Sequence, residues 1–237
     1  MKRTHSPNGR LNYLATLSSK FSAPPIISAE MIQKIQGLEE IDDAEFDSIY
    51  PPRIRAISDI QWSSIAAAHH IADLIGRNSK YRFIDIGSGV GKLCTLLSFL
   101  TELEIFGIEQ RKNLFEVSKA IAQENALDRV HFIHGNMLDL NWSDYDIFYF
   151  YNPFQEHICD DTDIALIDRD IDLDRKHYVQ YVSEVFRQMT WLTPGKKVIT
   201  FHGYGGQMPS TMKFLDSRPV DNGELCLWEK VAGENSL

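Results

Sequence analysis

Three glycines alternate with other residues in the segment Asp85-Ile-Gly-Ser-Gly-Val-Gly91, directly after an apolar run at 81–86. Glycine lets the backbone turn tightly and lets a ligand approach the main chain closely. In an open α/β sheet, ligands bind beyond the carboxyl ends of the strands. We therefore predict that this loop binds a cofactor, through Asp85, Gly87, Ser88, Gly89 and Gly91.

An acid, Glu109, ends the next apolar run, at 105–109. A carboxylate at a strand end can accept hydrogen bonds from two ribose hydroxyls. The alternative is a solvent-exposed acid that pairs with Arg111 or Lys112. We predict that Glu109 and its neighbour Gln110 bind the cofactor.

The pair Asn136-Met137 follows a third apolar run, at 130–134. A polar side chain beside an apolar one suits adenine, because the first can accept a hydrogen bond from the exocyclic amine while the second packs on the ring. Asn is also a common turn residue, which is the alternative. We predict that both residues contact the cofactor.

Asn152-Pro153-Phe154 ends a fourth run, at 146–151. Pro153 has no N–H and favours an extended conformation at Asn152. We expect this conformation to leave the Asn152 carbonyl and side-chain amide free to accept hydrogen bonds from an attacking amine. We predict that the three residues are catalytic and that Asn152 also contacts the cofactor; the alternative is a proline that merely ends a strand.

The elements around these motifs alternate between strand and helix. Apolar runs predict strands at 81–86, 105–109, 130–134, 146–151, 197–202, 212–217 and 225–230, and helical spacing or capping signals predict helices at 28–37, 58–75, 91–100, 113–125 and 178–192. Such alternation predicts a parallel sheet with helices on both faces. Asp221-Asn222-Gly223 predicts a terminal hairpin.

The predicted fold class is therefore α/β: a Rossmann-like, doubly wound, mostly parallel seven-stranded sheet with an antiparallel terminal hairpin and a helical N-terminal extension. Residues 1–57 would form a basic arm and this extension, and residues 58–237 the cofactor-binding domain.

The amino-acid composition indicates which classes of substrate the protein is suited to bind. The net charge of −9 disfavours nucleic acid, whose binding depends on a basic surface, and fits a basic protein or a small amine better. The segment 155–177 is acidic, so it would either attract such a substrate or form a solvated face.

Three separated cysteines without a CxxC pair predict a reducing compartment and no metal site. No signal-peptide or membrane-spanning run is visible, so we predict a cytoplasmic protein.

The order and spacing of the four motifs resemble those of class I S-adenosyl-L-methionine-dependent methyltransferases over about residues 58–230. The string at 85–91, with Asn152, is also similar to the histone-lysine methyltransferases that lack a SET domain. Asn152-Pro153-Phe154 is similar to the N-P-P-[FY] of enzymes that methylate amide or adenine nitrogen. The resemblance implies S-adenosyl-L-methionine as cofactor and methyl transfer to an acceptor, for which we expect an amine of a protein or small molecule.

The sequence departs from the family pattern in three places. Asn136 stands where the family usually has an acid, the fourth motif has one proline, and the helix between the fifth and sixth strands is reduced to 203–210. Trp62, Tyr151 and Phe154 are candidate aromatic walls for a sulfonium. The carboxylate of the cofactor could be reached by Arg53, Arg55, Ser63 or Ser64.

Two other functions compete. One is an NAD-linked oxidoreductase, but Lys92 occupies the position at which the dinucleotide fingerprint needs a third small residue. The other is a non-catalytic module that retains the cofactor pocket.

Overall fold

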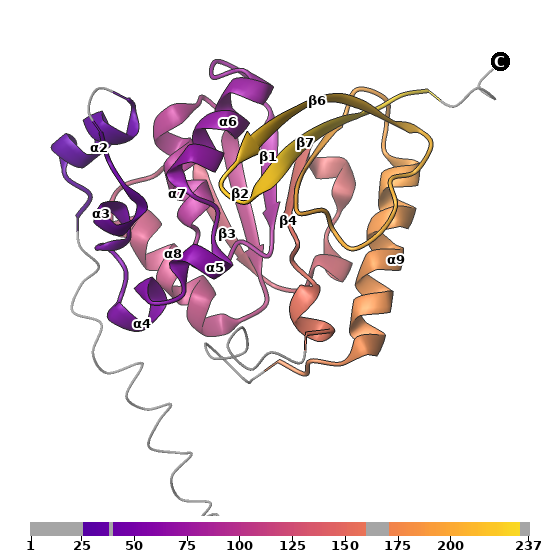
Figure 1. Ribbon diagram of the computed structural model, residues 1–237, viewed down its shortest axis with the longest axis horizontal. Helices are drawn as coiled ribbons and strands as arrows, with labels where there is room; N and C mark the ends of the chain where they lie inside the picture. Colours follow the sequence, from indigo (N-terminus) through magenta and orange to yellow (C-terminus); the bar gives the residue numbers. More distant parts are fainter. Residues whose placement is uncertain (1–25, 38–39, 160–170, 233–237) are drawn as a thin grey trace, which may run out of the picture.

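The computed structural model describes residues 26–37, 40–159 and 171–232, in which a seven-stranded sheet lies between two layers of helices (Figure 1). The strands are β1 (Arg82–Ile86), β2 (Glu104–Glu109), β3 (Val130–His134), β4 (Ile147–Tyr151), β5 (Lys197–Phe201), β6 (Met212–Val220) and β7 (Gly223–Lys230). Their order is β3-β2-β1-β4-β5-β7-β6; β1 to β5 are parallel, and β7 runs antiparallel to both β5 and β6. The predicted fold class is confirmed.

The chain reverses its direction across the sheet between β1 and β4. From β1 it continues to β2 and β3 on one side, and from β4 to β5 on the other. Such a reversal leaves a crevice at the carboxyl ends of the two central strands. The glycine-rich loop after β1 and the Asn-Pro-Phe motif after β4 therefore meet at one place.

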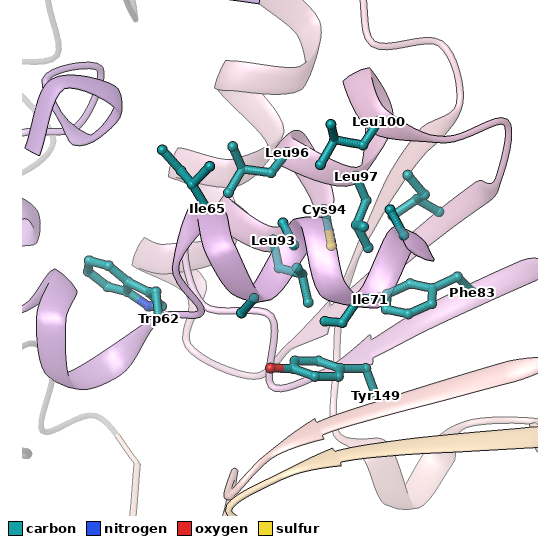
Figure 2. Packing of buried hydrophobic residues seen from close by; sticks show 14 of the residues in the cluster. Trp62, Ile65, Ile71, Phe83, Leu93, Cys94, Leu96, Leu97, Leu100 and Tyr149 are labelled. Carbon is teal, nitrogen blue, oxygen red and sulfur yellow. The ribbon is translucent and has the colours of Figure 1, made fainter. Parts of the chain in front are cut away.

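The two faces of the sheet carry different helices. One face is covered by α6 (Ile65–Ile75), α7 (Lys92–Leu100) and α8 (Lys112–Glu124), and the other by α9 (Arg175–Trp191) with the short 3-10 turns η2 (Met137–Asp139), η3 (Trp142–Asp144) and η4 (Gln155–His157). Figure 2 shows leucines of α7 packed with Phe83 and Tyr149 of the first face. None of the described helices is both long and apolar enough to cross a bilayer.

The expected helix at 58–75 is wrong as a single element. The structure has α5 (Ser58–Gln61) and α6, separated by Trp62, Ser63 and Ser64. Trp62 and Ser64 are extended, and the Ser64 side chain accepts the N–H of Ala67, so Ser64 caps a new helix. Because of this break the Trp62 side chain leaves the helix axis and reaches the glycine loop.

Two other local expectations have different outcomes. The predicted helix at 113–125 is α8, which begins one residue earlier, at Lys112, without a side-chain cap from Arg111. The predicted turn between the last two strands is confirmed: Asp221 and Asn222 join β6 to β7, and Asp221 has a φ of 50°. Residues 203–210, to which we expected the helix between the fifth and sixth strands to be reduced, contain no helix.

The helical extension packs on the sheet domain. Its helices are α2 (Ala29–Ile35), α3 (Asp43–Asp47) and α4 (Pro52–Arg55), and Ile35 and Phe46 lie in the same buried core as the α7 leucines. Lys92, the first residue of α7, is only 1% exposed, and its Nζ lies 2.7 Å from Asp43 Oδ1 and 2.8 Å from Asp47 Oδ1. The boundary at residue 58 stays a prediction, and the basic arm before residue 26 lies outside the described residues.

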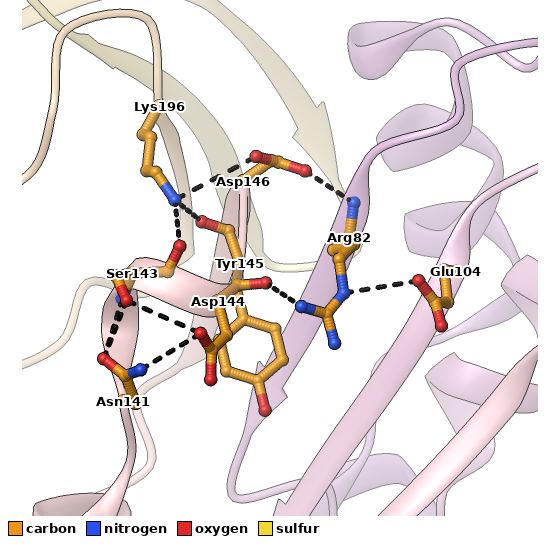
Figure 3. A network of polar contacts seen from close by, with 8 residues as sticks. All are labelled: Arg82, Glu104, Asn141, Ser143, Asp144, Tyr145, Asp146 and Lys196. Atoms are coloured by element: carbon orange, nitrogen blue, oxygen red, sulfur yellow. Dashed lines mark hydrogen bonds and ion pairs between the residues drawn. The ribbon is translucent and has the colours of Figure 1, made fainter.

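A polar network closes the opposite, amino-terminal edge of the sheet (Figure 3). The backbone N–H of Arg82 donates to Asp146 Oδ2 (2.9 Å), and its guanidinium lies 3.3 Å from Glu104. Lys196 donates to the carbonyl oxygens of Ser143 (2.8 Å) and Tyr145. These contacts tie the starts of β1, β2, β4 and β5 together, so this edge stabilises the sheet and leaves the carboxyl edge for binding.

A buried carboxyl group joins β1 to α7. Asp85 is 5% exposed, and the Cys94 thiol of α7 donates to its Oδ2 across 3.8 Å. Burial raises the pKa of Asp85 to about 7, and the nearby charge of Glu109 adds to this effect.

Gly91→Ala should destabilise the protein by about 3 kcal/mol, because two costs add. Gly91 is the N-cap residue of α7 and has a φ of 74°, and a Cβ there would overlap the Phe132 ring and lie 2.9 Å from Ser118 Cβ. The matched control is Gly195→Ala: Gly195 has a φ of 90°, but nothing lies within 4 Å of the added carbon. It should lose only about 1 kcal/mol. Equal losses in urea unfolding would disprove the packing argument.

The stability of the protein relative to Asp85→Asn should depend on pH. Folded Asp85 holds its proton up to about pH 7, whereas an unfolded Asp loses it near pH ~4. The contribution of Asp85 to the free energy of unfolding is therefore fully present below pH ~4 and is lost as the pH rises through ~7. The free energy of unfolding of the wild type minus that of Asp85→Asn should fall by more than about 1 kcal/mol between pH 4 and 8. Parallel pH curves for the two proteins would contradict the assignment.

Candidate active site

A cleft of about 180 Å³ opens at the carboxyl ends of β1, β2 and β4. Its walls come from the glycine loop, from the segments after β2, β3 and β4, and from α5 and α9. It is lined by Gln61, Trp62, Ile86, Gly87, Gly89, Ile108, Glu109, Gln110, Arg111, Leu114, Gly135, Asn136, Met137, Tyr151, Asn152, Pro153, Phe154, Gln155, Glu156 and Tyr181. All four motifs singled out in the sequence therefore contribute to one cleft.

The glycine loop is held by backbone hydrogen bonds. The N–H groups of Gly87 and Ser88 both donate to the carbonyl of Ile108, each at 3.0 Å. Gly89 has a φ of 55°, and a Cβ on it would lie 2.5 Å from Trp62 Nε1. The loop can therefore pack against Trp62 only because residue 89 is glycine.

Glu109 connects this loop to the end of β2. Its side chain is 5% exposed; Oε2 accepts the N–H of Gly89 (3.0 Å) and Oε1 accepts the N–H of Arg111 (2.7 Å). Burial raises the pKa of Glu109, and the hydrogen bonds from the two backbone N–H groups oppose this shift. The alternative of a solvent-exposed acid is wrong. Each carboxylate oxygen keeps one lone pair, so the group can still accept ligand hydroxyls.

Asn136 lies at the far end of the cleft, after β3. Its Oδ1 accepts the N–H of Leu138 (3.0 Å), and its Nδ2 donates to the hydroxyl of Tyr181 (2.6 Å). The Tyr181 hydroxyl also donates to Gln110 Oε1 (3.3 Å). The predicted acceptor role of Asn136 toward an adenine amine therefore depends on the second lone pair of its oxygen.

Aromatic and apolar side chains form the neighbouring wall. The rings of Phe154 and Tyr181 stack with centroids 5.0 Å apart and an interplanar angle of 9°. Met137 is 6% exposed and belongs to the same core cluster. Beside them Arg111 and Glu156 form an ion pair of 2.5 Å, with both side chains mostly buried. This pair links the segment after β2 to the segment after β4.

Asn152 does not have the expected backbone conformation. It has a φ of 40°, in the left-handed region, instead of the extended conformation expected before a proline. Its N–H donates to the carbonyl of Gly203 (3.1 Å), and its own carbonyl accepts the N–H of Gln155 (3.3 Å). These two bonds hold a turn that Asn tolerates better than most residues. The carbonyl is therefore engaged, whereas the side-chain amide has no hydrogen-bond partner within the described part of the chain.

Several residues expected to bind the cofactor do not line the cleft. Asp85 lies behind the loop, against Cys94. The Ser88 side chain is buried against Gly107, and Gly91 packs on Phe132. These residues shape the loop from the side opposite the cleft.

The polar residues considered for the cofactor carboxylate have other contacts. Ser63 shares a 2.6 Å hydrogen bond with the Tyr149 hydroxyl, and Ser64 donates to Asp221 Oδ2 (2.7 Å). Arg53 and Arg55 do not line the cleft either. Of the acidic segment 155–177, residues 160–170 lie outside the described residues.

Sequence reasoning missed several lining residues that the structure brings in. Gln61 comes from α5, Tyr181 from α9, and Arg111 pairs with Glu156 across the cleft. Tyr181 falls within the predicted helix at 178–192, and helical spacing does not distinguish a core ring from one whose hydroxyl enters a site. No local pattern signals the ion pair, since its members are far apart in sequence.

Comparison with known proteins agrees with this geometry. Residues 77–204, from just before β1 to just after β5, match a family model described as a methyltransferase domain. No curated protein sequence shows significant similarity to the chain.

Solved structures share the fold at low identity. TrmN from Thermus thermophilus superposes with a TM-score of 0.54 at 13% identity, over 71% of this chain and 49% of that chain. A protein from Methanococcus maripaludis described as an S-adenosyl-L-methionine-dependent methyltransferase gives 0.50 at 17% identity, over 76% and 91%. An RNA methyltransferase from Salinibacter ruber in complex with S-adenosyl-L-homocysteine gives 0.49 at 16%, over 72% and 95%. The family match covers more than half of the sequence, and the chain therefore belongs to the class I S-adenosyl-L-methionine-dependent methyltransferases.

Proposed function

We propose that the protein transfers the methyl group of S-adenosyl-L-methionine to an amine of a protein or of a small molecule. The observation that carries the proposal is the Asn152 side-chain amide, which lines the cleft without a hydrogen-bond partner among the described residues. Buried or half-buried polar groups are normally paired, so an open amide in a cleft suits a ligand. Its oxygen can accept a hydrogen bond from an attacking N–H.

The donor set of the cleft fits the cofactor. Glu109 offers carboxylate lone pairs to the ribose hydroxyls, and Gly87 and Gly89 allow close approach of the methionine part. The Asn136 amide and the Phe154–Tyr181 stack provide a polar and an aromatic surface for adenine. We propose that Gln110 and Met137, both of which line the cleft, also contact the cofactor.

The reaction requires positioning more than acid–base chemistry. The bound cofactor supplies a methyl group on a sulfonium, and the nucleophile must approach in line with the C–S bond. Asn152 orients the amine, while Pro153 and Phe154 fix the turn that presents it. The aromatic rings of Trp62 and Tyr151, which also line the cleft, exclude water and tolerate a cation.

The domain division and the cellular location also remain proposals. We propose that residues 58–237 form the catalytic domain and that the preceding helices form an extension on it. The three cysteines, all free in the structure, fit a reducing cytoplasm.

Glu109→Gln should weaken binding of S-adenosyl-L-homocysteine by about tenfold or more, because it removes charge-assisted hydrogen bonds and sets an NH₂ against a backbone N–H. Titration calorimetry measures this affinity. The matched control is Glu116→Gln, an exposed acid on α8, which should keep the wild-type Kd. An unchanged Kd for Glu109→Gln would show that the carboxylate does not bind the cofactor.

The acceptor can be sought with methyl-tritiated cofactor in a cell lysate. We expect label in protein or in small amines that survives alkali, because N-methyl groups are stable whereas methyl esters release methanol. Label that ribonuclease solubilises, or that alkali releases, would contradict the amine proposal.

With the labelled acceptor, Asn152→Gly tests the role of the amide. Glycine tolerates the left-handed φ, so the turn should persist without the side chain. We expect kcat to fall roughly 10- to 100-fold, with a smaller change in the Kd of S-adenosyl-L-homocysteine and an unchanged melting temperature. A wild-type kcat would exclude Asn152 from catalysis.

A further inference from the structure

We propose that a second cavity, adjoining the cleft, binds the methyl acceptor as a primary alkylammonium ion. This inference rests on the proposed function and adds to it the chemical class of the acceptor and its route into the site. The cavity measures about 300 Å³ and is lined by Asp43, Ser58, Trp62, Ser64, Lys92, Tyr151, Asp221 and Asn222. Its walls therefore come from α3, α5, the start of α6, the end of β4 and the β6–β7 turn.

The cavity meets the cofactor cleft at two aromatic residues. Trp62 and Tyr151 line both spaces. Tyr151 directly precedes Asn152, whose amide is the group proposed to orient the nucleophile. A chain that enters through the second cavity and passes these rings therefore arrives at the site of methyl transfer.

The charges around the cavity favour a cation. Lys92 is the only basic residue in the lining, and its Nζ is already paired with the two carboxylates of Asp43 and Asp47. That cluster has one cation against two anions. Asp221 adds a further carboxylate, and among the ion pairs of the described residues none includes it. The cavity therefore presents uncompensated negative charge to a ligand.

Asp221 is fixed in a position to use this charge. Its Oδ2 accepts a 2.7 Å hydrogen bond from Ser64 Oγ, which ties the β6–β7 turn to the start of α6. Asp221 and Tyr151 line the same cavity, and burial, followed by the charge of Asp221, raises the pKa of Tyr151. The ring faces of Trp62 and Tyr151 can contact both an alkyl chain and an ammonium group.

The reaction balances without another reagent. The alkylammonium first gives one proton to water. The lone pair of the neutral amine then forms the N–CH₃ bond as the C–S bond breaks and its electron pair goes to sulfur. The products are a methylated ammonium ion, the neutral thioether and one released proton.

The test uses two probes with the same carbon skeleton, N-acetyl-lysine methyl ester and N-acetyl-norleucine methyl ester, titrated by NMR into the full chain saturated with S-adenosyl-L-homocysteine. We expect the lysine ester to bind and the norleucine ester, which lacks the ammonium, to bind at least about tenfold more weakly. Asp221→Asn should weaken the lysine ester about tenfold. Asn also tolerates the left-handed φ of residue 221 and can still accept from Ser64, so the turn should survive.

The matched control is Asp216→Asn on β6, an acid whose Oδ1 lies 2.6 Å from Arg218 and which does not line the cavity. It should bind the lysine ester like the wild type. Equal binding of the two esters, or wild-type affinity in Asp221→Asn, would overturn the proposal.

The affinity for S-adenosyl-L-homocysteine separates the remaining outcomes. Asp221→Asn should leave that Kd within about twofold of the wild type. A loss of cofactor binding in this variant would mean that the cavity holds the amino-acid tail of the cofactor, which also overturns the proposal. If the wild type failed to bind S-adenosyl-L-homocysteine at all, the proposed function would fail, and the acceptor proposal, which rests on it, would fail with it.

Discussion

The carboxylate of Glu109 is the group on which the geometry of the site depends. It is buried and accepts one backbone N–H from the glycine loop after β1 and another from the segment after β2. A buried carboxylate without such donors would be strongly destabilising. The two loops are therefore held in an arrangement that pairs the charge, and Glu109 still lines the cleft, with lone pairs left to accept from a ligand. Burial makes the desolvation of the Glu109 carboxylate unfavourable, and the same burial would exclude water from the ribose hydroxyls that it would bind.

A second buried charge connects the helical extension to this loop. Lys92 follows the last glycine and is paired with two carboxylates of α3. Because an unpaired buried ammonium is unfavourable, α3 must stay docked whenever α7 is formed. Docking of α3 and α5 also sets the position of Trp62, which lies against Gly89 and borders both the cofactor cleft and the second cavity. The extension thus takes part in building the site.

Local patterns predicted the strands and the motif residues at their carboxyl ends. Apolar runs and glycine spacing are set by residues that lie close together in the sequence, so a single sequence is enough to recognise them. They failed where a distant partner decides the conformation. Asn152 is left-handed because its N–H reaches the carbonyl of Gly203. The helix at 58–75 is broken where Ser63 and Ser64 bond to Tyr149 and Asp221. Tyr181 enters the site from α9, which only the assembled sheet brings near β3.

The most direct test of the account is a crystal structure of the full chain with S-adenosyl-L-homocysteine. We expect both ribose hydroxyls within hydrogen-bond distance of the Glu109 carboxylate, with the bonds from Gly89 and Arg111 to that carboxylate retained. A ligand bound elsewhere, or a Glu109 side chain turned away from the ribose, would contradict the account.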